Sequence, residues 1–140
     1  MFMKIYLMIS TIIMSSVFLG CKKEESQSIE ETPESYTIEG KWVLEDFPNT
    51  AYIFENSLRY TVYCISTSCN WDTVTTAHAI PNPENYTFEN DTLKIDLGFG
   101  NSISNYMVFL CGGEVVKREY DAGQYVRWSR PPYDISNCNE

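Results

Sequence analysis

The stretch Tyr52-Ile53-Phe54-Glu55-Asn56-Ser57-Leu58-Arg59 decides the fold class. Aromatic side chains stand two residues apart, a polar turn follows, and apolar alternation then resumes, which is the pattern of a β-hairpin. A second stretch, Tyr86-Thr87-Phe88-Glu89-Asn90-Asp91-Thr92-Leu93-Lys94, repeats the pattern with one extra residue. In both, Tyr and Phe fall on one face, and Asn or Asp tolerates the positive φ of the turn. We interpret the repetition as two hairpins of one meander.

The chain after residue 36 predicts strands rather than helices, because no stretch places apolar residues at i, i+3, i+4 and i+7. Apolar alternation between turn residues predicts about eight strands. They are Ile38–Phe47, Ala51–Phe54, Leu58–Ser66, Tyr86–Phe88, Leu93–Leu97, Tyr106–Cys111, Glu114–Tyr120 and Gln124–Ser129. This pattern predicts an all-β fold, a small antiparallel up-and-down β-barrel, with a β-sandwich as the alternative. The long polar connection over residues 66–83 is expected to form a loop over one end.

The amino-terminal segment, residues 1–20, has the form of a secretory signal. Lys4 supplies a positive charge, residues 5–19 carry no charge, and Gly20 precedes Cys21. The segment resembles a bacterial lipoprotein signal, although Phe18 stands where that class more often has Leu. The resemblance implies cleavage before Cys21, attachment of a diacylglycerol to its thiol, and acylation of the new amino terminus by a fatty acid such as palmitate. Several acyl chains together anchor a protein stably in a bilayer.

Residues 21–35 are polar and acidic without periodicity, which predicts a flexible tether. The opening Cys21-Lys22-Lys23-Glu24-Glu25 resembles the charged tether of surface lipoproteins of the Bacteroidetes group. Residues 36–140 then form one domain. The resemblance implies a lipid-anchored protein of the outer membrane, on its periplasmic or its surface-exposed side. The alternatives are an ordinary signal peptide and an uncleaved anchor helix.

The net charge of −9 at pH 7 limits the possible partners. Nucleic-acid phosphates require a basic patch, so we expect no nucleic-acid partner. Peripheral binding to anionic lipid head groups is disfavoured for the same reason. A membrane contact is therefore expected to come through the lipid anchor.

The two ends of the predicted strand series carry a second resemblance. Gly40-Lys41-Trp42 opens the first strand, and Arg127-Trp128-Ser129-Arg130 ends the last. Together with the strand pattern, these segments resemble a lipocalin-like domain of the calycin type. The resemblance implies that Trp42 lies across the closed end of the barrel, with an arginine over its ring as a cation–π partner. Arg127 and Arg130 both fit, and the sequence does not choose between them.

The cysteines indicate an oxidising compartment. Beyond Cys21, the chain has Cys64, Cys69, Cys111 and Cys138, and an even number in an exported chain predicts two disulfides. Three pairings are possible. We favour Cys64–Cys69, which closes a small loop, and Cys111–Cys138, which attaches the carboxy-terminal tail.

No catalytic, cofactor or metal site is predicted. His78 is the only histidine, and no nucleophile motif accompanies it. A zinc site of His78 with Cys64, Cys69 and Cys111 is the alternative use of these residues. Its Cys-x₄-Cys spacing is looser than that of a usual zinc knuckle, and no second close pair exists. We therefore expect binding rather than catalysis.

Two functions remain open. In the first, the barrel holds a small hydrophobic ligand. The proposed aromatic lining is Tyr52, Phe54, Tyr60, Tyr86, Phe88, Phe109 and Tyr125. In the second, these side chains fill the core, and a structural or accessory envelope protein contacts a protein partner through its long loop and tail. A domain of about 100 residues has little room for both a full core and a large cavity. We expect ligand binding, with the accessory role as the alternative.

Overall fold

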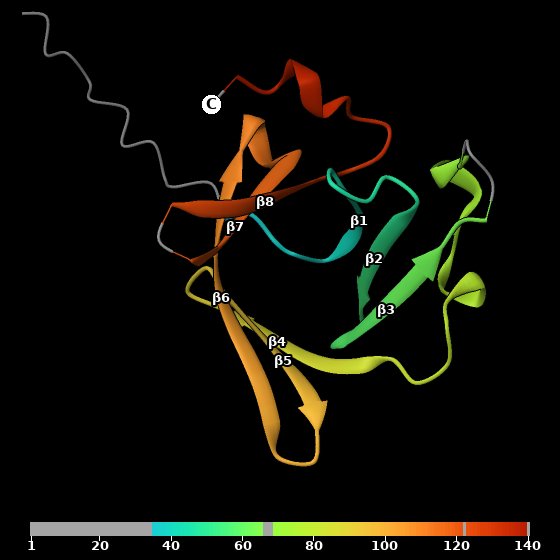
Figure 1. Cartoon of the computed structure of the whole chain (residues 1–140), viewed down its shortest axis with the longest axis vertical. Coiled ribbons are helices and arrows are strands. Elements are labelled where there is room, and N and C mark those ends of the chain that lie inside the picture. The colour runs from blue at the N-terminus through green and yellow to red at the C-terminus, as the bar shows by residue number, and fades with distance from the viewer. Residues whose placement is uncertain (1–34, 66–68, 122, 140) are drawn as a thin grey trace, which may run out of the picture. The chain divides into compact units, whose positions relative to one another are not determined.

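The computed structural model describes residues 35–139 except 66–68 and 122. Each strand pairs antiparallel with the next, and the first pairs with the last to close a barrel (Figure 1). The strands are β1 Gly40–Leu44, β2 Thr50–Glu55, β3 Leu58–Tyr63, β4 Glu84–Glu89, β5 Thr92–Gly98, β6 Asn101–Leu110, β7 Val115–Asp121 and β8 Gln124–Ser129. The predicted all-β up-and-down barrel is confirmed, and the sandwich alternative is wrong.

Every predicted strand corresponds to an observed one, and the largest difference concerns β6. Its predicted start was Tyr106, but the strand begins at Asn101. The missed half is polar apart from Ile103, so its sequence alone does not mark it as a strand. Residues 101–105 form a strand because they pair with β5, where Ile103 stands opposite Ile95 of the barrel core.

Short 3₁₀ helices, which the sequence did not predict, occupy the connections. They are η1 Trp71–Thr73, η2 Thr76–His78, η3 Cys111–Gly113 and η4 Ile135–Asn137. Over the residues that the structure describes, no helix has the length and apolar character needed to span a bilayer.

Strand register determines which side chains fill the barrel. Residues directly opposite each other in an antiparallel pair point to the same side of the sheet. Trp42 of β1 faces Tyr52 of β2, and Val116 of β7 faces Trp128 of β8. These inward positions belong to one continuous core. Its buried members are Ile38, Trp42, Phe54, Tyr86, Leu93, Ile95, Met107, Val116 and Trp128.

The connections alternate between the two ends of the barrel, as an up-and-down meander requires. The β2–β3 and β4–β5 turns and η3 lie at one end, which we call the closed end. The β1–β2, β3–β4, β5–β6 and β7–β8 connections lie at the other, which we call the open end.

Two disulfides join the four cysteines of the barrel domain, with the favoured pairing. Cys64–Cys69 has a Cα–Cα distance of 6.0 Å and Cys111–Cys138 one of 5.8 Å, both within the usual range. The disulfide prediction is confirmed. The zinc alternative is excluded, because it needs thiolates that these cysteines no longer offer.

Candidate functional site

An arginine–tryptophan pair covers the closed end of the barrel. Trp42 is fully buried, and its Nε1 donates a hydrogen bond to the Ile38 carbonyl at 2.7 Å. The guanidinium carbon of Arg130 lies 4.1 Å from the centroid of the Trp42 ring, within cation–π range. Of the two candidate arginines, Arg130 is therefore the one over the tryptophan.

The hydrogen bonds of Arg130 join three separate segments. It donates to the carbonyls of Thr37 at 2.7 Å, Glu39 at 2.8 Å and Gly113 at 3.2 Å. Gly40 leaves room for this head group, because a Cβ there would lie 2.5 Å from Arg130 Nη1. Burial lowers the pKa of Arg130 below its ordinary value. With its donors satisfied by backbone, Arg130 has a structural role.

Arg127 lies on the outer side of β8 and is paired differently. Its Nη2 and Nε donate to the Glu45 carboxylate at 2.5 and 2.9 Å. This hydrogen bonding to Glu45 raises the pKa of Arg127 above its ordinary value. The pair connects β8 to the connection that follows β1.

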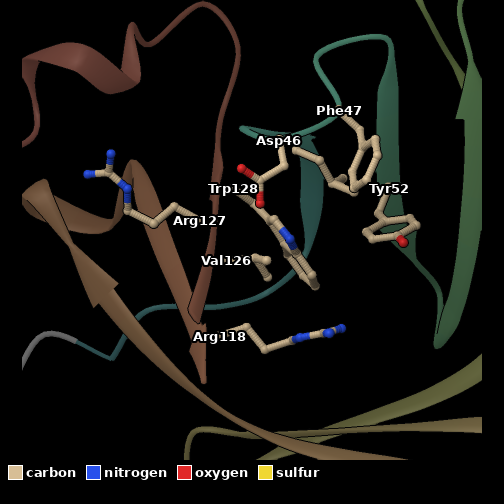
Figure 2. Close-up of a pocket in the computed structure, with 8 residues that line it drawn as sticks. Asp46, Phe47, Tyr52, Arg118, Val126, Arg127 and Trp128 are labelled. Carbon is tan, nitrogen blue, oxygen red and sulfur yellow. The ribbon is translucent and has the colours of Figure 1, made fainter. Parts of the chain in front are cut away.

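A cavity of about 160 Å³ lies at the open end, between β1, β2, β7 and β8 (Figure 2). Its walls combine aromatic and aliphatic side chains with charged groups. The lining residues are Leu44, Asp46, Phe47, Tyr52, Arg118, Val126, Arg127 and Trp128. Asp46 and Arg118 lie on opposite sides of the Trp128 ring in Figure 2.

Strand register explains why Arg118 points into this cavity. Arg118 stands opposite Met107 on β6 and Val126 on β8, and Met107 is a buried core residue. Alternation along β7 places Arg118 on the same inward face as Val116. Sequence reasoning missed Arg118. The signal was its two-residue spacing from Val116, which becomes informative only once the inward face of β7 is known.

The Arg118 guanidinium has aromatic neighbours but no hydrogen-bonding acceptor for its inner nitrogen. Its guanidinium carbon lies 5.9 Å from the ring centroids of both Trp128 and Tyr120. Its Nε is buried and makes no hydrogen bond within the described part of the chain. Among the side chains that the structure describes, no carboxylate forms a salt bridge with it. Arg118 thus faces the interior without an ion-pair partner among the described side chains.

Arg59 is a second inward arginine, and it is neutralised. It stands opposite Glu84 of β4 and forms an ion pair with that carboxylate. Its Nε donates to Glu84 Oε2 at 2.8 Å, and its guanidinium carbon lies 4.6 Å from the Tyr52 ring centroid.

The seven aromatic residues predicted to line a ligand site lie in different places. Tyr52 lines the cavity. Phe54 and Tyr86 belong to the buried core, and Phe88 and Phe109 pack against it.

Tyr60 and Tyr125 point away from the interior. Tyr60 stands opposite Ile53, out of phase with the inward Phe54, and Tyr125 is 53% exposed. Periodicity identified aromatic strand positions but not which of them border open space, because that depends on packing across the barrel.

Two further polar residues have local roles. Tyr86 donates a hydrogen bond from its hydroxyl to Glu39 Oε1 at 2.5 Å. Burial, followed by that hydrogen bond, raises the pKa of Tyr86 well above its ordinary value. His78 is exposed, and its Nδ1 accepts a hydrogen bond from the Thr75 backbone N–H at 3.2 Å.

Cys21, with the signal segment and the tether, lies outside the described residues. Comparison of the chain with protein-family models, with curated proteins and with solved structures found no match.

Proposed function

We propose that this protein binds a small ligand in the open-end cavity of its barrel while acyl chains on Cys21 anchor it to a bacterial outer membrane. The observation that carries the binding function is the cavity itself, because its walls combine aromatic and aliphatic side chains with the charged side chains of Asp46, Arg118 and Arg127. Ligand sites in proteins commonly have this composition. The Gly40, Trp42 and Arg130 arrangement favours a lipocalin-like relationship for the domain.

The cavity size limits the ligand. Drug-sized ligands occupy pockets of roughly 300–1,000 Å³. A cavity of about 160 Å³ suits a smaller molecule, or one end of a larger molecule that projects through the open end.

Binding is tested with N-phenyl-1-naphthylamine, a neutral apolar fluorophore, added to the purified full-length protein. Val126→Trp fills the cavity, and we expect it to abolish the fluorescence increase. The matched control is Tyr125→Trp, which adds the same ring to the outer face of the same strand. Equal binding by both variants would contradict the proposed site.

The anchor is tested with Cys21→Ser. We expect the variant to lose its acyl mass and to leave the envelope fraction, because the acyl chains on Cys21 are the proposed contact with the bilayer. An unlipidated variant that fractionates with the envelope as before would contradict the anchor.

The second candidate function is an accessory role in the envelope through contact with another protein. The observation that favours it is the full exposure of Ile65 and Phe99, on two open-end connections. A photo-crosslinking amino acid at position 99 in intact cells should then give one discrete adduct with an envelope protein. Absence of any adduct would contradict this role.

A further inference from the structure

We propose that the ligand carries a carboxylate, and that Arg118 binds this group inside the barrel. The inference rests on the proposed binding function and specifies the chemical class of the ligand. Two kinds of observation support it. Buried donors in the barrel lack hydrogen-bond acceptors, and the other arginines near the cavity are already paired with carboxylates.

The first observation is the orphan donor on Arg118. Buried polar groups in folded proteins nearly always have hydrogen-bond partners, and exceptions call for an explanation. Arg118 Nε is buried without one. Arg118 is one of the residues that line the cavity, so a molecule bound there would lie against its side chain.

The second observation is a neighbouring orphan donor, Asn105 Nδ2. Asn105 stands opposite the fully buried Leu93 of β5, which places its side chain on the inward face of β6. It precedes by two residues Met107, the partner of Arg118 in the β6–β7 ladder. In the described part of the chain, both unsatisfied buried side-chain atoms are therefore donors, and the missing group is an acceptor.

Charge balance singles out Arg118 among the basic residues near the cavity. Arg59 pairs with Glu84, and Arg127 pairs with Glu45. Asp46, the acid of the cavity wall, lies on the other side of Trp128 from Arg118 (Figure 2). An anion near Arg118 would meet a positive charge that forms no salt bridge with a carboxylate of the described side chains.

The shape of the site favours a carboxylate on a flat apolar body. A guanidinium binds a planar carboxylate through two parallel hydrogen bonds. Trp128 and Tyr52 provide aromatic walls, and Leu44 and Val126 provide aliphatic ones. The structure therefore points to a small aromatic or branched carboxylic acid.

The test compares two ligands of one shape, 1-naphthoate and 1-naphthamide, by calorimetric titration of the purified full-length protein at neutral pH. We expect the carboxylate to bind about tenfold more tightly, as a charge-assisted hydrogen bond predicts. Arg118→Met should remove the preference while binding of the amide persists. Lys117→Met is the matched control, because it removes a positive charge from the residue next to Arg118 on the outer face of β7, where its Nζ lies 5.2 Å from the Tyr125 ring centroid. It should keep the preference.

Equal affinities of the wild-type protein for the two ligands would overturn this inference and leave the proposed function standing. Retention of the preference in Arg118→Met would also overturn it. Binding of neither ligand would overturn both. The wild-type comparison decides the question even if Arg118→Met does not fold, because it requires no variant.

Discussion

The barrel contains two arginine–tryptophan pairs that differ in how completely the arginine is bonded. At the closed end, Arg130 lies 4.1 Å from the Trp42 ring and donates to three carbonyls. At the open end, Arg118 lies 5.9 Å from the Trp128 ring, and its buried Nε has no acceptor. The comparison teaches that one pair of residue types can be fully hydrogen-bonded in one place and leave a buried donor without an acceptor in another.

The difference arises from the backbone near each arginine. At the closed end, the segment before β1 and the η3 turn bring carbonyl groups to the Arg130 head group. At the open end, the cavity separates the β1–β2 connection from β7. Among the described residues, no carbonyl oxygen accepts a hydrogen bond from the buried Arg118 Nε there.

The largest expected effect distinguishes the two arginines directly. Arg130→Met should lower the free energy of unfolding by about 4 kcal/mol, because three carbonyls lose a charged donor. Arg118→Met should change it by less than about 1 kcal/mol, since it removes a buried donor that had no acceptor. Urea denaturation measures both. Similar losses would show that the two ends do not differ as described.

The two disulfides extend the comparison to covalent links. Removing Cys111–Cys138, with a sequence separation of 27, should cost about 3.5 kcal/mol by loop-closure entropy. Removing Cys64–Cys69, with a separation of 5, should cost about 2 kcal/mol. Paired Cys→Ser variants and thermal unfolding give the values. A reversed order would indicate that enthalpic terms outweigh chain entropy.

Two glycines with positive φ sharpen the comparison further. Gly40 has φ +111° and a Cβ would meet Arg130, whereas Gly100, in the β5–β6 turn, has φ +80° and nothing within 4 Å. Both Ala variants incur backbone strain, but Gly40→Ala must also displace the guanidinium. We expect it to cost about 2 kcal/mol more than Gly100→Ala, measured as a difference in unfolding midpoints. Equal costs would mean that Arg130 moves aside freely.

The smallest effect is a pH dependence at the closed end. The pKa of Tyr86 is raised above its ordinary value of 10.0, so this tyrosine ionises in the unfolded chain before it does in the barrel. Its contribution to stability is complete below about pH 10 and is lost as the pH rises further, by no more than about 1.4 kcal/mol per pH unit. Tyr86→Phe should make the alkaline loss of stability shallower. An unchanged slope would contradict this.

Fold prediction from the sequence succeeded where strand alternation was strong. β8 was predicted with its observed bounds, Gln124–Ser129, because the apolar Val126 and Trp128 stand two residues apart between the turn at Asp121-Ala122-Gly123 and the two prolines that follow Arg130. It failed for the first half of β6, where Ile103 is the only apolar residue and pairing with β5 makes the strand. Arg118 was missed for a related reason. A basic residue on a strand is expected to face solvent unless the register of that strand with its neighbours shows otherwise.

By itself, the sequence determined the all-β fold class, the eight strands and the tryptophan of the closed end, because these depend on local alternation, turn residues and a short motif. Only the tertiary structure decided that Arg130 rather than Arg127 covers Trp42, and that Arg118 faces the interior without an acceptor. The physical reason is that both outcomes depend on which atoms approach from strands distant in the chain. Barrel closure and strand register determine which of these atoms come close to each arginine. Neither is a property of any one segment of the sequence.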